Sequence, residues 1–71
     1  MTVRAQMIAD HWEATNEKAF RRLKAAGCLE KAAEEAAERA ANVLAEAKQS
    51  GMSVIAAVKL SRKEWEKPPS V

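Results

Sequence analysis

The sequence contains few of the residues from which catalytic and metal sites are usually built. Its 71 residues include one cysteine, Cys28, and one histidine, His11. A single cysteine excludes a disulfide within the chain and fits a reducing compartment, so we expect a cytoplasmic protein. His11 has no second histidine and no carboxylate three or four residues away, the spacing that a metal site on one helix would use. We therefore predict no metal and no cofactor.

Glycine and long apolar runs are also scarce. Gly27 and Gly51 are the only glycines, which leaves no glycine-rich loop for a phosphate. No apolar run is long enough to span a bilayer, and the start around Arg4 is not typical of a secretory signal. Twelve basic and ten acidic residues give a formal charge of +2, which by itself predicts neither a nucleic acid nor a membrane as partner. We expect no membrane contact and identify no small-molecule substrate.

The sequence does contain a long segment of strong helix formers between Cys28 and Ser50, rich in alanine and glutamate. Its apolar residues recur every three or four positions and share one face: Leu29, Ala33, Ala36, Ala40, Val43 and Ala47. Since that face consists mostly of methyl groups, neighbouring helices can approach it closely. A second apolar edge lies about 100° round the helix, at Ala37, Ala41 and Leu44.

Two interpretations are open for the segment before this helix. Thr2 is a suitable N-cap, and apolar residues follow at helical spacing until Asn16 interrupts the pattern. One interpretation, which we favour, is a single helix over about residues 3–26, continuous or bent. The other is a break at Thr15 and Asn16 with Asn16 capping a second piece, because both side chains compete for backbone hydrogen bonds.

The segment after the central helix predicts a further helix. Gly27 and Gly51 are both placed to end a helix in the left-handed conformation. Ser53 is a good N-cap for a helix running to about Lys67, before Pro68 and Pro69. That helix would carry its large apolar residues on one side: Val54, Ile55, Val58 and Trp65.

Short connections between helices favour antiparallel neighbours. The sequence therefore predicts an all-α fold, either a small three-helix bundle or a helical hairpin with a third arm. We expect a single domain over residues 1–67 and a short flexible tail over 68–71. The inventory of large apolar side chains is small for a chain of this length, which favours a partner chain that completes the core.

Acidic residues crowd the first half of the central helix: Glu30, Glu34, Glu35 and Glu38. Carboxylates are stabilised near a helix N-terminus, and the pairs Lys31–Glu35 and Glu35–Arg39 have the spacing for ion pairs. The other acids are scattered, so no partner carboxylates are expected on the facing helices. We predict no catalytic residues, and hence a protein that is not an enzyme.

Basic residues gather near the ends of the first and last predicted helices: Arg21, Arg22, Lys24, Lys59, Arg62, Lys63 and Lys67. In an up-down-up bundle these ends lie together, next to the acidic start of the central helix. Compensation of the glutamates and the negative helix ends is the interpretation that we favour. A basic patch for an acidic protein or a nucleic acid is the alternative. Any nucleic-acid binding is expected to be weak.

The candidate protein contacts are the two tryptophans and the second apolar edge of the central helix: Trp12, Ala37, Ala41, Leu44 and Trp65. Core anchors are the favoured interpretation for both tryptophans, although tryptophan is also enriched at binding hot spots. Pairing of two chains through these edges would bury the aromatic side chains. We therefore expect a homodimer slightly more often than a monomer.

Several of these features occur together in one known family. They are a His-x-Glu pattern near the start, an aromatic and a leucine before a helix stop, a long helix rich in Glu, Ala and Arg, and a last helix with a tryptophan. The residues that carry them are His11, Glu13, Phe20, Leu23, Gly27, Cys28, Leu29, Gly51, Met52 and Trp65. In this order the chain resembles the TnpV proteins, small helical proteins encoded by transposons, and related short reading frames of prophages. The family has no established activity. The resemblance implies a small cytoplasmic accessory protein of a bacterial mobile element or phage.

These observations favour a small non-enzymatic interaction protein of the adaptor or inhibitor type. It would bind another protein or a second copy of itself. The alternative is a nucleic-acid-associated accessory factor that uses the shared basic end.

Overall fold

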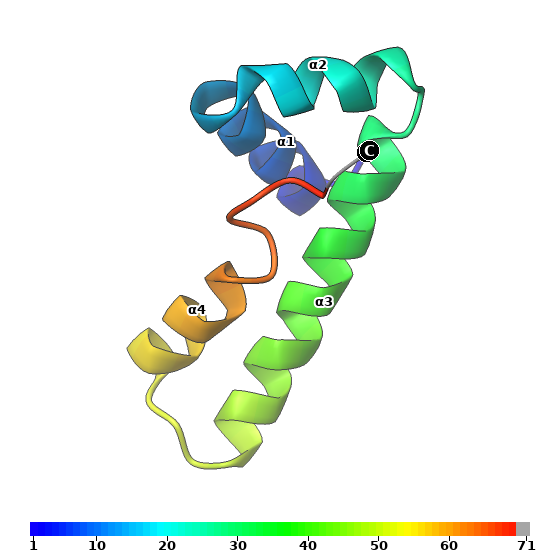
Figure 1. Cartoon of the computed structure of the whole chain (residues 1–71). Coiled ribbons are helices and arrows are strands. Elements are labelled where there is room, and N and C mark those ends of the chain that lie inside the picture. Colours follow the sequence, from blue (N-terminus) through cyan, green and yellow to red (C-terminus); the bar gives the residue numbers. More distant parts are fainter. Residues whose placement is uncertain (70–71) are drawn as a thin grey trace.

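The computed structural model describes residues 1–69, which form four helices and no strand. These are α1 (Val3–Thr15), α2 (Glu17–Ala25), α3 (Leu29–Gln49) and α4 (Val54–Arg62). The long helix α3 is the spine of the fold (Figure 1). The first two helices pack on its first half, and α4 runs back along its second half without packing on α1. The all-α prediction is confirmed.

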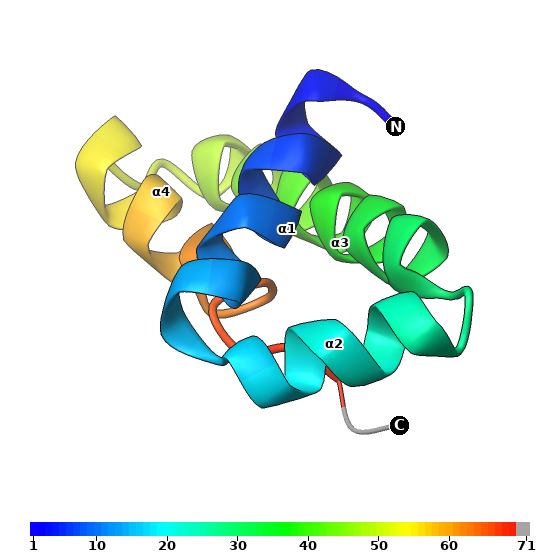
Figure 2. The ribbon, with the colours of Figure 1, turned by 90° about the horizontal axis from the view of Figure 1, so that it is seen from above.

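The favoured single helix over residues 3–26 is wrong, because the chain breaks at Asn16. The Asn16 side chain accepts a hydrogen bond from the N–H of Ala19 at 3.3 Å and so caps α2. The Thr15 hydroxyl donates to the carbonyl of His11 at 2.8 Å. These local hydrogen bonds replace the helical ones, and α2 turns away from α1 (Figure 2).

The predicted glycine stops are confirmed at both ends of α3. Gly27 and Gly51 have φ angles of 73° and 87°, which L side chains rarely adopt. In each turn the N–H after the glycine donates back across the turn, from Cys28 to the carbonyl of Leu23 at 3.0 Å and from Met52 to the carbonyl of Ala47 at 3.1 Å. Both connections are therefore tight, and α4 is held antiparallel to α3.

The last helix ends earlier than predicted. It begins after Ser53, whose side chain accepts from Ala56 as expected, but it stops at Arg62 rather than near Lys67. The next residues form a turn, in which the N–H groups of Glu64 and Trp65 donate to the carbonyls of Ser61 and Arg62, each at 3.1 Å. Of the predicted flexible tail, only residues 68–69 are described; 70–71 lie outside the described residues.

The core lies where α1 and α2 meet the first half of α3. The largest fully buried side chains are Trp12, Ile8 and Leu23. They pack on the alanine face of α3, and that predicted face is confirmed as the buried one: Ala33, Ala36, Ala40 and Ala47 are buried, with Leu29 and Val43 half-buried. The methyl groups let α1 approach α3 closely enough to enclose the indole of Trp12.

Candidate interaction surface

Large aliphatic side chains face solvent on α4, as Val3 and Met7 also do on α1. Val54, Ile55 and Val58 are 62%, 72% and 50% exposed. We call these three residues the α4 face. They lie on adjacent turns of one helix and so form a continuous patch. Apolar patches of this kind mark contacts with other molecules more often than single exposed residues do.

The α4 face is exposed because α4 packs on α3 through its small residues, on a different side of the helix. The buried residues of α4 are Ala57 and Ser61, on the side of α4 that packs on α3. The Ser61 hydroxyl donates to the carbonyl of Val58 at 2.9 Å, so its burial leaves no polar group unpaired. Small residues on both helices bring them close together, and the larger side chains of α4 are left on the outside.

Next to the α4 face, the other edge of α4 forms a shallow depression of about 340 Å³. Its walls are apolar and basic: Met52, Ala56, Leu60, Lys59 and Lys63. No carboxylate lies within α4 itself, which spans Val54–Arg62. The solvent side of α4 is therefore apolar and positively charged, and it suits a partner surface that is apolar and acidic.

The segment after α4 is fastened to α1 by the two tryptophans. The indole N–H of Trp12 donates to the carbonyl of Trp65 at 2.7 Å. The Trp65 ring meets His11 edge-on, with the centroids 5.0 Å apart and the planes at 85°. The guanidinium of Arg62 lies 5.5 Å from the centroid of the same ring. These contacts fix the C-terminal end of α4 against the corner between α1 and α2.

The structure separates the predicted protein contacts. Trp12 is 0% exposed and Ala37 is 8% exposed, so within one chain they belong to the core that α1 covers. Ala41, Leu44 and Trp65 are half-buried. The interpretation of Trp12 as a core anchor is the one that this burial supports.

The predicted basic patch is spread over three places. Arg21, Arg22 and Lys24 lie on α2, and Arg21 forms an ion pair with Glu17 on the same helix. Lys59 and Lys63 line the depression beside Leu60. Arg62 and Lys67 line another depression, of about 570 Å³, with His11, Thr15 and Asn16. The break at Asn16 turns α2 away, so its C-terminal end does not extend α1 toward the end of α4.

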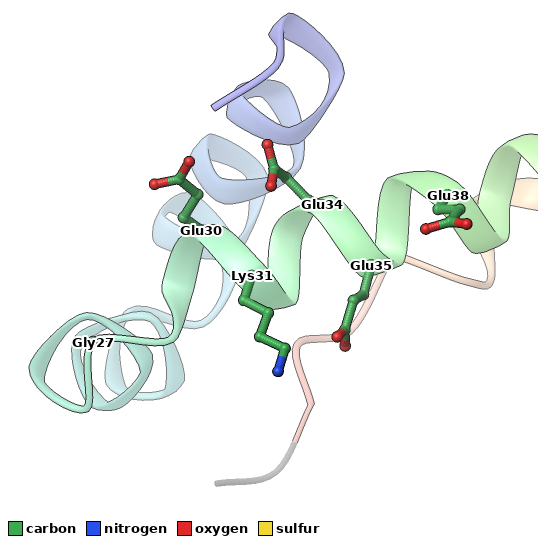
Figure 3. Close-up of a pocket in the computed structure, with 6 residues that line it drawn as sticks. All are labelled: Gly27, Glu30, Lys31, Glu34, Glu35 and Glu38. Atoms are coloured by element: carbon green, nitrogen blue, oxygen red, sulfur yellow. The ribbon is translucent and has the colours of Figure 1, made fainter.

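The acidic side chains in the first half of α3 lie at the surface, where Glu30, Glu35 and Glu38 are exposed and Glu34 is half-buried. A shallow pocket of about 460 Å³ is lined by Gly27, Glu30, Lys31, Glu34, Glu35 and Glu38. Glu30 and Glu34 project to one side of the helix, and Lys31 and Glu35 to the other (Figure 3). Glu30 pairs with the terminal amine of Met1 at 3.3 Å. The predicted pairs Lys31–Glu35 and Glu35–Arg39 do not form within residues 1–69, because exposed pairs of this kind gain little energy from one fixed geometry.

Other kinds of site find no support in the described part of the chain. Residues 1–69 contain no group of three or more histidine, cysteine or acidic side chains arranged to hold a metal ion. Among the helices of these residues, none has the length and apolar character that crossing a membrane requires. Cys28 is half-buried against the core at the start of α3, and its side chain makes no capping hydrogen bond.

Sequence reasoning missed the α4 face, although its residues were assigned to one side of the helix. No contact with another molecule was predicted for that side. A signal was present in the small residues of the same helix: Ala57 and Ser61 share a face that matches the alanine face of α3 in size.

Comparison of the chain with family models, with curated proteins and with solved structures yields no match.

Proposed function

We propose that this chain is a non-enzymatic protein-interaction protein, of the adaptor or inhibitor type, and that the α4 face is its contact surface. The observation that supports this is the exposure of Val54, Ile55 and Val58 in a chain with few large apolar residues. Burying such side chains in a contact contributes about 1.5–3 kcal/mol each. The first half of α3 holds its own core without them.

The setting of this activity follows from the resemblance to the TnpV proteins. We propose a cytoplasmic accessory role for a bacterial mobile element or phage. The chemistry of the surface narrows the kind of partner further, since the basic side chains beside the α4 face favour an acidic contact.

The test is a double substitution on the α4 face, Ile55→Glu with Val58→Glu. The matched control places the same two charges at exposed alanines away from α4, Ala14→Glu with Ala25→Glu. Each tagged protein is used to capture partners from an extract of the organism that carries the sequence, followed by mass spectrometry. We expect the α4 variant to lose at least tenfold of any partner that both the wild type and the control retain.

Circular dichroism shows in parallel that both variants keep their helical content. A partner captured equally by the wild type and both variants would contradict the proposal, because the contact would then lie elsewhere on the molecule.

A further inference from the structure

A groove on the opposite half of the molecule carries a charge opposite to that of α4. It lies between the start of α1 and the middle of α3, has a volume of about 320 Å³ and is lined by Thr2, Arg4, Glu34, Ala37, Glu38 and Ala41. We call it the α3 groove; Figure 2 shows the first turns of α1 crossing α3 there. Its floor is the methyl groups of two alanines. Two carboxylates against one guanidinium make its formal charge negative.

The order of residues along the groove suits a helix that runs antiparallel to α3. Ala41 lies toward the C-terminal end of α3, with Glu38 and Glu34 about 4.5 and 10.5 Å before it at ~1.5 Å per residue. On α4 the order is reversed. Val54 comes first, and Lys59 and Lys63 follow about 7.5 and 13.5 Å further along.

An antiparallel helix with Val54 level with Ala41 therefore places each lysine close to the level of a carboxylate along the axis, on the flank of the contact. Lys59 falls about 3 Å beyond Glu38, and Lys63 about 3 Å beyond Glu34, by the same rise per residue. A flexible lysine side chain spans that offset easily. Val58 would then lie over the floor of the groove, where small side chains allow close packing.

We propose that the α4 face of a second copy of this chain occupies the α3 groove, and that the exchange is reciprocal. The inference rests on the proposed function, because it names the partner of the α4 face. Each chain carries both the basic, apolar helix and the acidic groove. A two-fold axis therefore forms two equivalent contacts and leaves neither surface open. Contacts made head to tail rather than reciprocally would build a filament, which sedimentation equilibrium distinguishes from a dimer.

The test uses charge reversal on each side of the contact. One variant carries Lys59→Glu with Lys63→Glu, and the other carries Glu34→Lys with Glu38→Lys. In either variant alone, both contacts of a homodimer place like charges together, which disfavours association. In an equimolar mixture, the acidic α4 of the first variant meets the basic groove of the second. The second contact is the wild-type pairing, with the α4 lysines of the second variant against the groove carboxylates of the first.

Sedimentation equilibrium over a range of concentrations measures the association. We expect the wild type to dimerise, each variant alone to associate at least tenfold more weakly, and the mixture to recover a heterodimer near the wild-type affinity. The charge-matched control, Lys18→Glu with Lys24→Glu on α2, should associate like the wild type.

A wild type that stays monomeric at all concentrations would overturn the second copy as occupant. The capture experiment with the Glu variants of Ile55 and Val58 would still decide whether the α4 face binds another protein. A dimer unaffected by either reversal, or a mixture that recovers nothing, would overturn the α3 groove as the docking surface.

Discussion

The two halves of α3 present the same kind of alanine face but pack in different ways. The first half receives Trp12, Ile8 and Leu23 and buries them completely. The second half receives Ala57 and Ser61, and the larger side chains of α4 stay outside. The difference shows that a face of methyl groups does not determine what it will bury. The size of the residues that the neighbouring helix turns toward it decides the outcome.

This contrast divides the molecule into a part that holds the fold together and a part that is free to bind. The first half forms a core closed by the hydrogen bond from Trp12 to Trp65. The second half holds α4 through a tight turn and through contacts with small side chains, so no large apolar side chain of α4 is buried there. The exposed aliphatic groups of α4 are then available for another molecule.

The largest expected effect comes from removing the centre of the core. Trp12→Ala should destabilise the fold by about 3–5 kcal/mol, because a fully buried indole is lost and a cavity remains. Val58→Ala on the exposed α4 face should change the stability of the monomer by less than about 0.5 kcal/mol. Denaturant unfolding measures both.

Where Trp12→Ala does not fold, Ile8→Val supplies the same comparison at a smaller size, with an expected cost of about 0.5–1.5 kcal/mol. Equal costs for the Ile8 and Val58 substitutions in dilute solution would remove the contrast between the two halves.

An intermediate effect is expected from enlarging the small residues on each side of α3. Ala36→Leu and Ala40→Leu overpack the contact with the core and should cost roughly 1–3 kcal/mol. Ala57→Leu should cost less, because α4 packs on α3 alone and has room to shift. The exposed Ala14→Leu is the control. A larger loss for Ala57→Leu than for Ala36→Leu in thermal unfolding would show that the α4 contact is the more rigid one.

The smallest effect concerns nucleic acid. We expect only weak, non-specific binding whose affinity falls with salt, measured by fluorescence anisotropy at several salt concentrations. Since the basic residues are divided between α2 and the end of α4, the pairs Arg21 with Arg22 and Arg62 with Lys63 should each lower the salt slope independently when replaced by Gln. A salt-resistant, sequence-selective interaction would reverse the ranking of the two functions.

The local features of the fold could be predicted because they depend on neighbouring residues. The glycine turns at Gly27 and Gly51, the cap at Ser53 and the buried face of α3 all follow from residue type and spacing. The break at Asn16 depends on a small difference between two hydrogen-bonding patterns, and the weight of the apolar stripe favoured the wrong one. The turn after Arg62 places the carbonyl of Trp65 on the indole N–H of Trp12, a contact between residues 53 positions apart that no local pattern shows.

The candidate surface was harder to predict for the same reason. The sequence shows that α4 has both large aliphatic and small residues, but the choice between them belongs to the contact with α3. Ala57 and Ser61 pack against α3 because their small side chains let the two helices approach closely. The buried Ser61 hydroxyl is also paired, with the carbonyl of Val58. Ala37 was expected on an open edge, yet the start of α1 covers it.

Native-state hydrogen exchange in dilute, monomeric protein tests the central claim, that only the first half of α3 carries a self-contained core. We predict that amides in residues 33–40 exchange only through global unfolding, and that amides of α4 exchange at least tenfold faster through local opening. Protection of α4 should rise once a partner or a second copy is bound. Equal protection of α4 and residues 33–40 in the monomer would contradict the account.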